Sequence, residues 1–367
     1  MWVMVMRCVF KHHVYLCVVS TALMAGLSLI TSHTSKAYAD QNCGSSGGVG
    51  TVKTIQHNDQ PIVCDSRETR ILSSTRGGKD ININMDKHSG KAAVTVKDGA
   101  NITILKKLKV TGGLKGGGLP VIKVLNKGQL TLVEEVDVEG VTGGMQKVIA
   151  VEGQGSSVTL KGVLKGFERV KINDGGAVTL LKDGVEIKKV EVNNGGTVRF
   201  DESVAFNNGE AGIKIEGTGK ASVMGMGKTM TVTKGGGIQM DGTGTADVMG
   251  LTIMGSGMGV DVQNGREMTL NMVNVSGFRV GVNAQSGTVN INGESTITVK
   301  DGGTGIMVSG SGATVSMTQG KITGSRSGGT GVVMQNGREM TLTGVGISKF
   351  GKGVDVTGGT LKMMGGR

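Results

Sequence analysis

The chain is almost free of aromatic residues and of proline. Its 367 residues include 1 Trp, 2 Tyr, 6 Phe and 2 Pro, and no Trp or Tyr follows Tyr38. Without these rings the chain lacks the platforms on which bases stack, which argues against a nucleic-acid partner; aromatic platforms for sugar rings are missing too. Proline removes a backbone donor from a strand that is paired on both sides. Its scarcity is therefore compatible with a continuous sheet.

Motifs for nucleophilic or phosphate chemistry are also missing. The segment Gly225–Thr229 resembles the end of a phosphate-binding loop, but the glycine that this loop requires first is Ser222. No Gly-x-Ser-x-Gly occurs, and His57 and His88 have no Ser or Cys nearby that suggests a triad. The sequence predicts a protein that is not an enzyme and that needs no cofactor or metal.

One acidic run leaves an alternative open. Glu134, Glu135, Asp137 and Glu139 would alternate outward on one strand. Such carboxylates could bind Ca²⁺, as in polysaccharide lyases with a β-helix fold. A single row of carboxylates is more often a solvated face, which leaves lyase activity as the alternative.

What the chain does contain is a repeat. The octapeptide Gln263–Leu270 recurs letter for letter as Gln335–Leu342. Between and around the two copies a smaller unit, a glycine followed by Ile or Val, recurs roughly every 22 to 26 residues, a length typical of solenoid repeats. These glycines are Gly212, Gly237, Gly259, Gly281, Gly305, Gly331 and Gly353. In a solenoid each unit buries its apolar face against its neighbours.

The pattern inside one repeat predicts strands. Apolar and polar residues alternate after each glycine, and two or three such short segments are separated by Gly, Asn, Asp and Ser. The sequence therefore predicts an all-β fold, a right-handed parallel β-helix of about 22–26 residues per turn. One inward column should contain Val260, Val282, Ile306, Val332 and Val354. We expect the 66 glycines to supply positive φ at corners and most methionines to point inward.

The N-terminus predicts export. Arg7 and Lys11 precede the apolar run 14–30, and Ala37 and Ala39 then provide small residues just before Asp40. Residues 1–39 are therefore predicted to be a signal peptide cleaved after Ala39. The alternative is an anchoring helix, but the run is short for a membrane span.

The remaining chain divides into two predicted parts. Cys43 and Cys64 are a lone pair of cysteines in an oxidising compartment, which predicts a disulfide. Residues 40–95 are polar and irregular, so we expect a disulfide-stapled cap that covers the edge of the first rung. Residues 96–367 are predicted to form the β-helix.

Positive charge gathers near the predicted cap. Residues 40–130 contain 14 Lys and Arg against 7 Asp and Glu. Within this region Lys106, Lys107 and Lys109 form an apolar-basic pattern associated with heparin-like polyanions, which makes heparan sulfate a candidate ligand. The alternative is a solvated strand face whose lysines prevent edge pairing.

Several segments together resemble a known group of proteins. They are the leader Met6–His13, the start Gln41–Cys43 with Pro61–Asp65, and the repeated Met-Thr-Leu pattern of residues 268–276 and 340–348. The chain resembles the passenger region of Bartonella autotransporters, including their angiogenic-factor subfamily. This resemblance implies a right-handed β-helix that a C-terminal outer-membrane barrel carries out of the cell. In that subfamily it also implies action on an endothelial growth-factor receptor, without identifying contact residues.

These observations lead to one expected function. No segment here has the aromatic girdles of a translocator barrel, so we expect the barrel to be missing from this chain. The expected function is that of a non-enzymatic adhesin or host-cell ligand, secreted or displayed at the cell surface via the periplasm. Without a barrel, the chain alone should remain periplasmic. The alternatives are a pro-angiogenic receptor agonist and a pectate-lyase-like enzyme.

Overall fold

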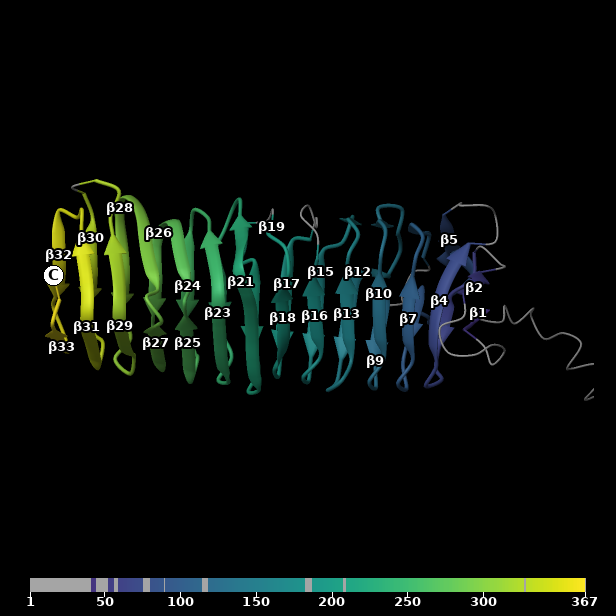
Figure 1. Cartoon of the computed structure of the whole chain (residues 1–367), viewed down its shortest axis with the longest axis horizontal. Coiled ribbons are helices and arrows are strands. Elements are labelled where there is room, and N and C mark those ends of the chain that lie inside the picture. Colours follow the sequence, from purple (N-terminus) through teal and green to yellow (C-terminus); the bar gives the residue numbers. More distant parts are fainter. Residues whose placement is uncertain are drawn as a thin grey trace, which may run out of the picture. The chain divides into compact units, whose positions relative to one another are not determined.

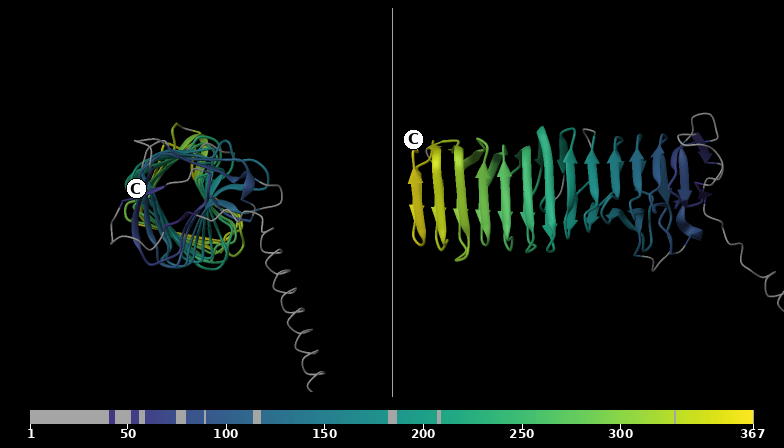
Figure 2. Two further views of the ribbon diagram at one scale, coloured as in Figure 1. Left: turned by 90° about the vertical axis from the view of Figure 1, so that its right-hand side faces the viewer. Right: turned by 60° about the horizontal axis from the view of Figure 1, so that its bottom comes forward.

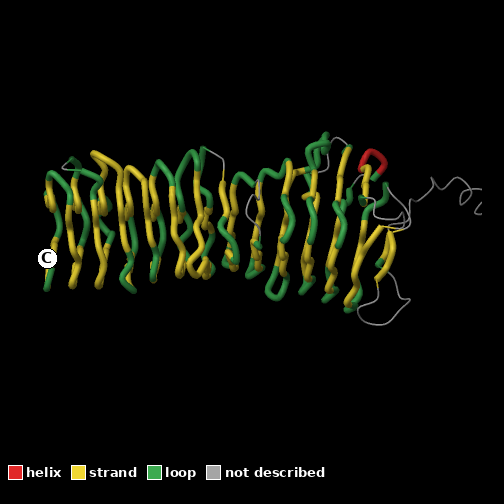
Figure 3. The backbone as a smooth tube through the Cα atoms, turned by 45° about the horizontal axis from the view of Figure 1, so that its top comes forward, coloured by secondary structure: helices red, strands yellow, loops and turns green. Residues whose placement is uncertain are grey.

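A computed structural model describes residues 41–43, 52–55, 59–74, 80–88, 90–113, 118–181, 187–206, 209–326 and 328–366. They belong to one compact unit, Asp40–Arg367. Strands dominate, and the described part has a single short 3-10 helix, η1 (Met85–Lys87) (Figure 3). Ala37, Ala39 and Asp40, which form the predicted cleavage site, lie outside the described residues, as does the predicted signal peptide.

In the described ranges, no helix has the length and apolar character needed to cross a membrane.

Three ladders of parallel strands run along the Asp40–Arg367 unit. The first ladder contains β1 (Gln41–Asn42), β3 (Ile62–Cys64), β6 (Val94–Val96), β9 (Pro120–Leu125), β12 (Gln146–Glu152), β15 (Arg169–Asn173), β17 (Lys189–Asn193), β20 (Ile213–Glu216), β22 (Ile238–Met240), β24 (Met258–Val262), β26 (Asn274–Ala284), β28 (Thr296–Val308), β30 (Thr330–Met334) and β32 (Lys352–Val356).

The second ladder contains β2 (Val52–Ile55), β4 (Thr69–Ser74), β7 (Asn101–Ile104), β10 (Gln129–Leu132), β13 (Ser157–Leu160), β16 (Ala177–Leu180), β18 (Gly196–Phe200), β21 (Lys220–Val232), β23 (Thr245–Met254), β25 (Glu267–Asn271), β27 (Thr288–Asn292), β29 (Thr314–Thr323), β31 (Glu339–Ser348) and β33 (Thr360–Met364).

The third ladder begins with β5 (Ile81–Asn84), β8 (Leu108–Thr111), β11 (Val136–Asp137) and β14 (Leu164–Lys165). It resumes at β19 (Val204–Phe206) and continues through parts of the long strands β21, β23, β26, β28, β29 and β31, which turn a corner and belong to two ladders. Figure 1 shows the rungs in one row, from β1 and β2 to β32 and β33, and Figure 2 shows the chain coiling around a common axis. The predicted all-β fold, a parallel β-solenoid, is confirmed.

The predicted inward column is also present. Val260 pairs with Val282, which pairs with Ile306, then Val332 and finally Val354. The first four of these side chains are fully buried, and Val354, on the final rung, is half-buried. Each aliphatic side chain lies directly above its counterpart on the previous rung, so the core is continuous along the first ladder.

Rung length is more variable than the sequence predicts. The step along the chain from Ile62 to its partner Val94 is much longer than the step from Val170 to its partner Val190. The longer step includes the third-ladder strand β5 and the helix η1, and the first-ladder pairing keeps its inward register across both steps. The predicted boundary near residue 96 also needs correction, because strands of residues 62–95 already continue the same ladders and part of the expected cap is therefore solenoid.

Corner glycines such as Gly99, Gly175 and Gly195 have positive φ as expected, whereas the glycines of the repeated Gly-Ile or Gly-Val pair have a different cause. Gly281 and Gly305 are outside the set of positive-φ glycines. A Cβ atom on Gly305 would lie 2.2 Å from Ile322 Cγ2 and 2.4 Å from the carbonyl oxygen of Gly331. A Cβ atom would lie within 2.9 Å of another atom at six of the seven repeat positions, so neighbouring rungs approach too closely for a side chain there; Gly353, on the last rung, is the exception.

The methionines do not lie mostly inward as expected. Met268 and Met317 are buried on inward columns, whereas Met226, Met258 and Met272 are exposed. The unbranched methionine side chain is tolerated on both faces of these strands, so a methionine in the sequence does not predict whether its side chain points inward or outward.

Candidate functional site

The two cysteines lie at equivalent positions of successive rungs. Cys43 and Cys64 form a disulfide with their Cα atoms 4.9 Å apart. Asn42 pairs with Val63, and Cys64 pairs in turn with Val96, whose side chain is buried in the core. Both cysteines are buried. The disulfide thus joins the first rung to the second from inside the core, rather than attaching a separate cap.

The predicted polyanion site is partly neutralised. Lys106 and Lys107 precede β8, and Lys109 lies within it. Lys107 Nζ is 2.6 Å from Glu135 Oε1, and Lys165 Nζ is 3.0 Å from Glu135 Oε2. The hydrogen bond from Lys107 holds the pKa of Glu135 below its ordinary value, and the same bond raises the pKa of Lys107. Lys107, the middle lysine of the basic run, is therefore not a free cation.

The acidic run does not form the expected outward row. Only Asp137 lies on a strand, β11, where it pairs in register with Lys109. Glu134 Oε2 accepts a hydrogen bond from the backbone N–H of Lys107, and Asp137 Oδ1 accepts one from the N–H of Glu139. One turn of the solenoid thus brings the predicted basic and acidic runs together, where they compensate each other.

No group of three or more His, Cys, Asp or Glu in the described ranges is placed to hold a metal ion. His88 is buried, and its Nε2 lies 2.7 Å from the carbonyl oxygen of Asp59. His57 lies outside the described residues.

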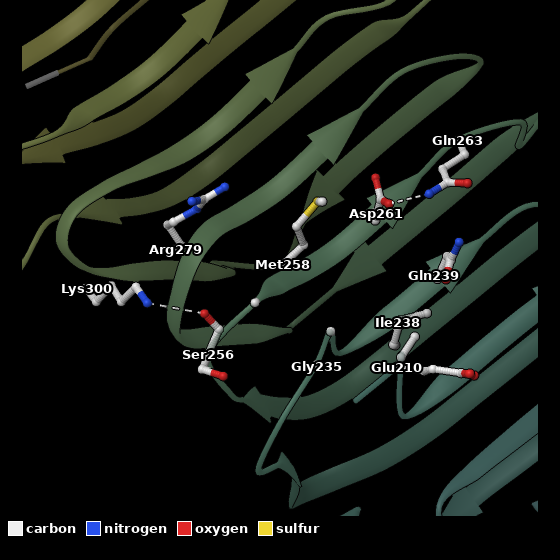
Figure 4. A pocket seen from close by; sticks show the side chains of 13 residues that line it. Glu210, Gly235, Ile238, Gln239, Ser256, Met258, Asp261, Gln263, Arg279 and Lys300 are labelled. Carbon is white, nitrogen blue, oxygen red and sulfur yellow. Dashed lines mark hydrogen bonds between the residues drawn. The ribbon is translucent and has the colours of Figure 1, made fainter. Parts of the chain in front are cut away.

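A pocket of about 540 Å³ opens on the first ladder, over β22 and β24 and the turns that lead into them (Figure 4). Three glycines of these turns, Gly235, Gly236 and Gly257, line the pocket without contributing side chains. A Cβ atom on Gly235 would lie within 1.9 Å of the carbonyl oxygen of Glu210, and one on Gly257 within 2.8 Å of the carbonyl oxygen of Gly235. Because successive turns pack closely, these positions have no room for side chains, and this leaves the pocket open.

A buried carboxylate lies at one end of this pocket. Asp261 is 6% exposed. Its Oδ1 accepts hydrogen bonds from the side-chain amides of Asn283, at 2.8 Å, and Gln285, at 3.2 Å, while Oδ2 accepts one from Gln263 at 2.8 Å. A buried charge requires such partners, since burying it unpaired would be costly. Three amides from two successive rungs therefore hold Asp261 in place.

The neighbouring Asn283 leaves one acceptor unused. Asn283 is 6% exposed, and its Oδ1 is buried with no hydrogen-bond donor among the described residues. The next side chain in its outward column is Met307, which carries no donor. A buried acceptor without a partner costs about 1–3 kcal/mol, and because Asn283 does not line the pocket this buried oxygen is not offered to a ligand there.

The other end of the pocket is cationic. Arg279 and Lys300 are exposed and come from the two rungs that follow, β26 and β28. Lys300 Nζ reaches back two rungs and donates a hydrogen bond of 3.4 Å to the carbonyl oxygen of Ser256. Arg279 forms no ion pair with any carboxylate of the described ranges. In Figure 4, Arg279 and Lys300 lie on one side of Met258, and Asp261 and Gln263 lie on its other side.

Sequence reasoning did not identify this pocket, although part of the signal was present. Gln239, Asp261 and Asn283 each follow the repeated Gly-Ile or Gly-Val pair, and their strands pair in register. Alignment of the repeats at that glycine places the three polar residues in one outward column. Arg279 and Lys300 lie outside this spacing, because the pairing of β26 with β28 is irregular between residues 276 and 280.

No protein-family model, no curated protein and no solved structure matches the chain.

Proposed function

We propose that this chain is an exported β-solenoid that acts as a non-enzymatic adhesin or host-cell ligand. The observation that carries the proposal is the lateral pocket, with a buried carboxylate at one end and two exposed cations at the other. The resemblance of the chain's leader and repeats to those of Bartonella autotransporter passengers supports the same function, with export through the periplasm to the cell surface.

The scaffold suits recognition rather than catalysis. Each polar group of the pocket is attached to a strand or turn that pairs on both sides, so its position is set before a ligand arrives. Preorganised groups lose little conformational entropy on binding. Asp261, the pocket's buried carboxylate, is engaged by three amides and so is poorly placed to transfer a proton.

Binding to cells is the direct test. The Asp40–Arg367 unit, fluorescently labelled, should bind cultured endothelial or epithelial cells in a saturable way that excess unlabelled protein abolishes. An array of many copies on a bacterial surface would strengthen weak single contacts by multivalency. Failure to observe saturable binding to any cell type would refute an adhesin or ligand function.

The same preparation separates the alternatives. A receptor agonist would trigger phosphorylation of an endothelial growth-factor receptor when added as soluble protein. A polysaccharide lyase would release unsaturated uronides from pectate or heparan sulfate. An adhesin should bind without either response.

A further inference from the structure

We infer that the pocket over β22 and β24 binds a carboxylated saccharide, with the sugar hydroxyls at the Asp261 end and the carboxylate at the Arg279 end. This inference rests on the proposed function, because it names the ligand class for the same surface. It goes further in predicting which side chains discriminate between a charged and an uncharged sugar.

The polar end of the pocket is built to accept hydrogen bonds. A carboxylate such as that of Asp261 has about four acceptor positions, of which three are filled. Gln239, half-buried and also lining the pocket, adds an amide. Hydroxyl groups both donate and accept, so neighbouring sugar hydroxyls satisfy this mixture of acceptors and amides.

The cationic end selects for negative charge. Arg279 lacks a carboxylate partner among the described residues, and Lys300 is engaged only by the carbonyl oxygen of Ser256. Guanidinium and carboxylate groups match in geometry and form charge-assisted hydrogen bonds. Glu210, which also lines the pocket, forms an ion pair of 2.6 Å with Lys189.

The pocket's size and composition suit one or two sugar rings. Its volume of about 540 Å³ lies within the range of small-molecule pockets. It contains no aromatic side chain, and Met258 is its large exposed apolar contact. Recognition therefore depends on polar and ionic contacts. We expect weak binding by a single pocket, on the order of 0.1–1 mM, because stacking does not contribute.

Three probes test the ligand class by saturation-transfer NMR and titration calorimetry on Asp40–Arg367. Sialyllactose and a glucuronate-containing hyaluronan disaccharide represent the two sources of a carboxylated sugar, and lactose is the uncharged control. We expect at least one carboxylated probe to bind about tenfold more tightly than lactose. Equal binding of all three, or binding of none at 10 mM, overturns the inference.

Paired variants test the assigned residues. The double variant Arg279→Gln/Lys300→Gln should lower the affinity for the carboxylated probe about tenfold, to the level of lactose. The control Arg266→Gln/Lys321→Gln changes the net charge equally at two exposed positions outside the pocket and should leave affinity unchanged. Equal losses in both double variants would show that only net charge matters, and the inference would fail.

The acceptor end requires a separate variant. Gln239→Ala should weaken all sugar probes several-fold, lactose included, because it removes the amide of a half-buried side chain that lines the pocket. Unchanged affinity in this variant contradicts the placement of the hydroxyls.

Cell binding distinguishes this inference from the proposed function. If Arg279→Gln/Lys300→Gln loses the sugar preference and cell binding together, both stand. If wild type binds cells and the double variant binds them equally well, the protein remains an adhesin and the inference falls. If the sugar data hold but wild type does not bind cells, the proposed function falls instead. Binding of a tri-glutamate peptide in preference to both sugars would identify a protein ligand and overturn the inference.

Discussion

An aspartate at position 306 should destabilise the solenoid locally and severely. Ile306 is fully buried, and it lies between Val282 and Val332 in the inward column. Neither neighbour offers a hydrogen bond to a carboxyl group. The variant Ile306→Asp thus introduces a polar group where the adjacent rungs supply only aliphatic side chains.

The expected cost follows from two contributions. Loss of a fully buried isoleucine side chain removes about 2–3 kcal/mol of hydrophobic stabilisation. Burial of a carboxyl group without a partner adds on the order of 2 kcal/mol or more. The free energy of unfolding should therefore fall by about 4–5 kcal/mol for Ile306→Asp, compared with about 1 kcal/mol for the milder Ile306→Val.

Urea unfolding followed by far-ultraviolet circular dichroism measures this cost. Stability in a solenoid is approximately a sum over neighbouring rungs, so limited proteolysis should also show new cleavage sites near β28 and β30. The matched control is Met307→Asp, since Met307 is the next residue on the same strand and points outward, half-buried. It should unfold at nearly the wild-type urea concentration.

The comparison of these two adjacent positions tests the register itself. A one-residue slip of the strand would exchange inward and outward side chains. Equal shifts for Ile306→Asp and Met307→Asp, or a larger shift for the latter, would refute the assignment of the inward column.

Three further predictions concern other parts of the solenoid. Gly281→Ala places a methyl group 2.2 Å from Ile297 Cγ2, so the rungs must shift and the thermal midpoint should fall measurably in a calorimetric scan. A thermal midpoint unchanged from wild type would contradict the steric role of the repeated glycines. Reduction of the disulfide between Cys43 and Cys64, 21 residues apart, should remove about 3 kcal/mol of loop-closure stabilisation at the first rung, seen as earlier proteolysis of β1 and β2 with reductant than without. The pKa of Glu135 is lowered in the folded chain, so its ion pairs stabilise the fold at pH values above the ordinary Glu pKa of about 4.3, and this stabilisation is lost as the pH falls further. Glu135→Gln should therefore make the free energy of unfolding depend less steeply on pH in the acid range. An unchanged pH dependence would show that the ion pairs contribute nothing.

Much of the fold follows from local pattern. Alternation after each repeated glycine specifies strands, and the equal steps from Ile238 to Val260 and from Val260 to Val282 place these side chains on one column. The rungs of residues 62–95 were harder to recognise, because each strand contributes only two or three inward residues and lacks the Gly-Val pair. Their register is imposed by the neighbouring rungs rather than by their own sequence.

What the sequence alone determined is therefore the repeat, the parallel solenoid, the inward column and the pair of cysteines, since all of these depend on residue type and spacing along one strand. Only the tertiary structure decided which side chains from different turns meet. Lys107 and Glu135 pair because they occupy adjacent rungs, and Lys300 reaches Ser256 because bulges in β26 and β28 lengthen that turn. The pocket depends on those turn conformations, whose lengths vary from rung to rung. A strand repeats its geometry with its sequence, whereas a turn takes its shape from the rungs stacked on either side of it.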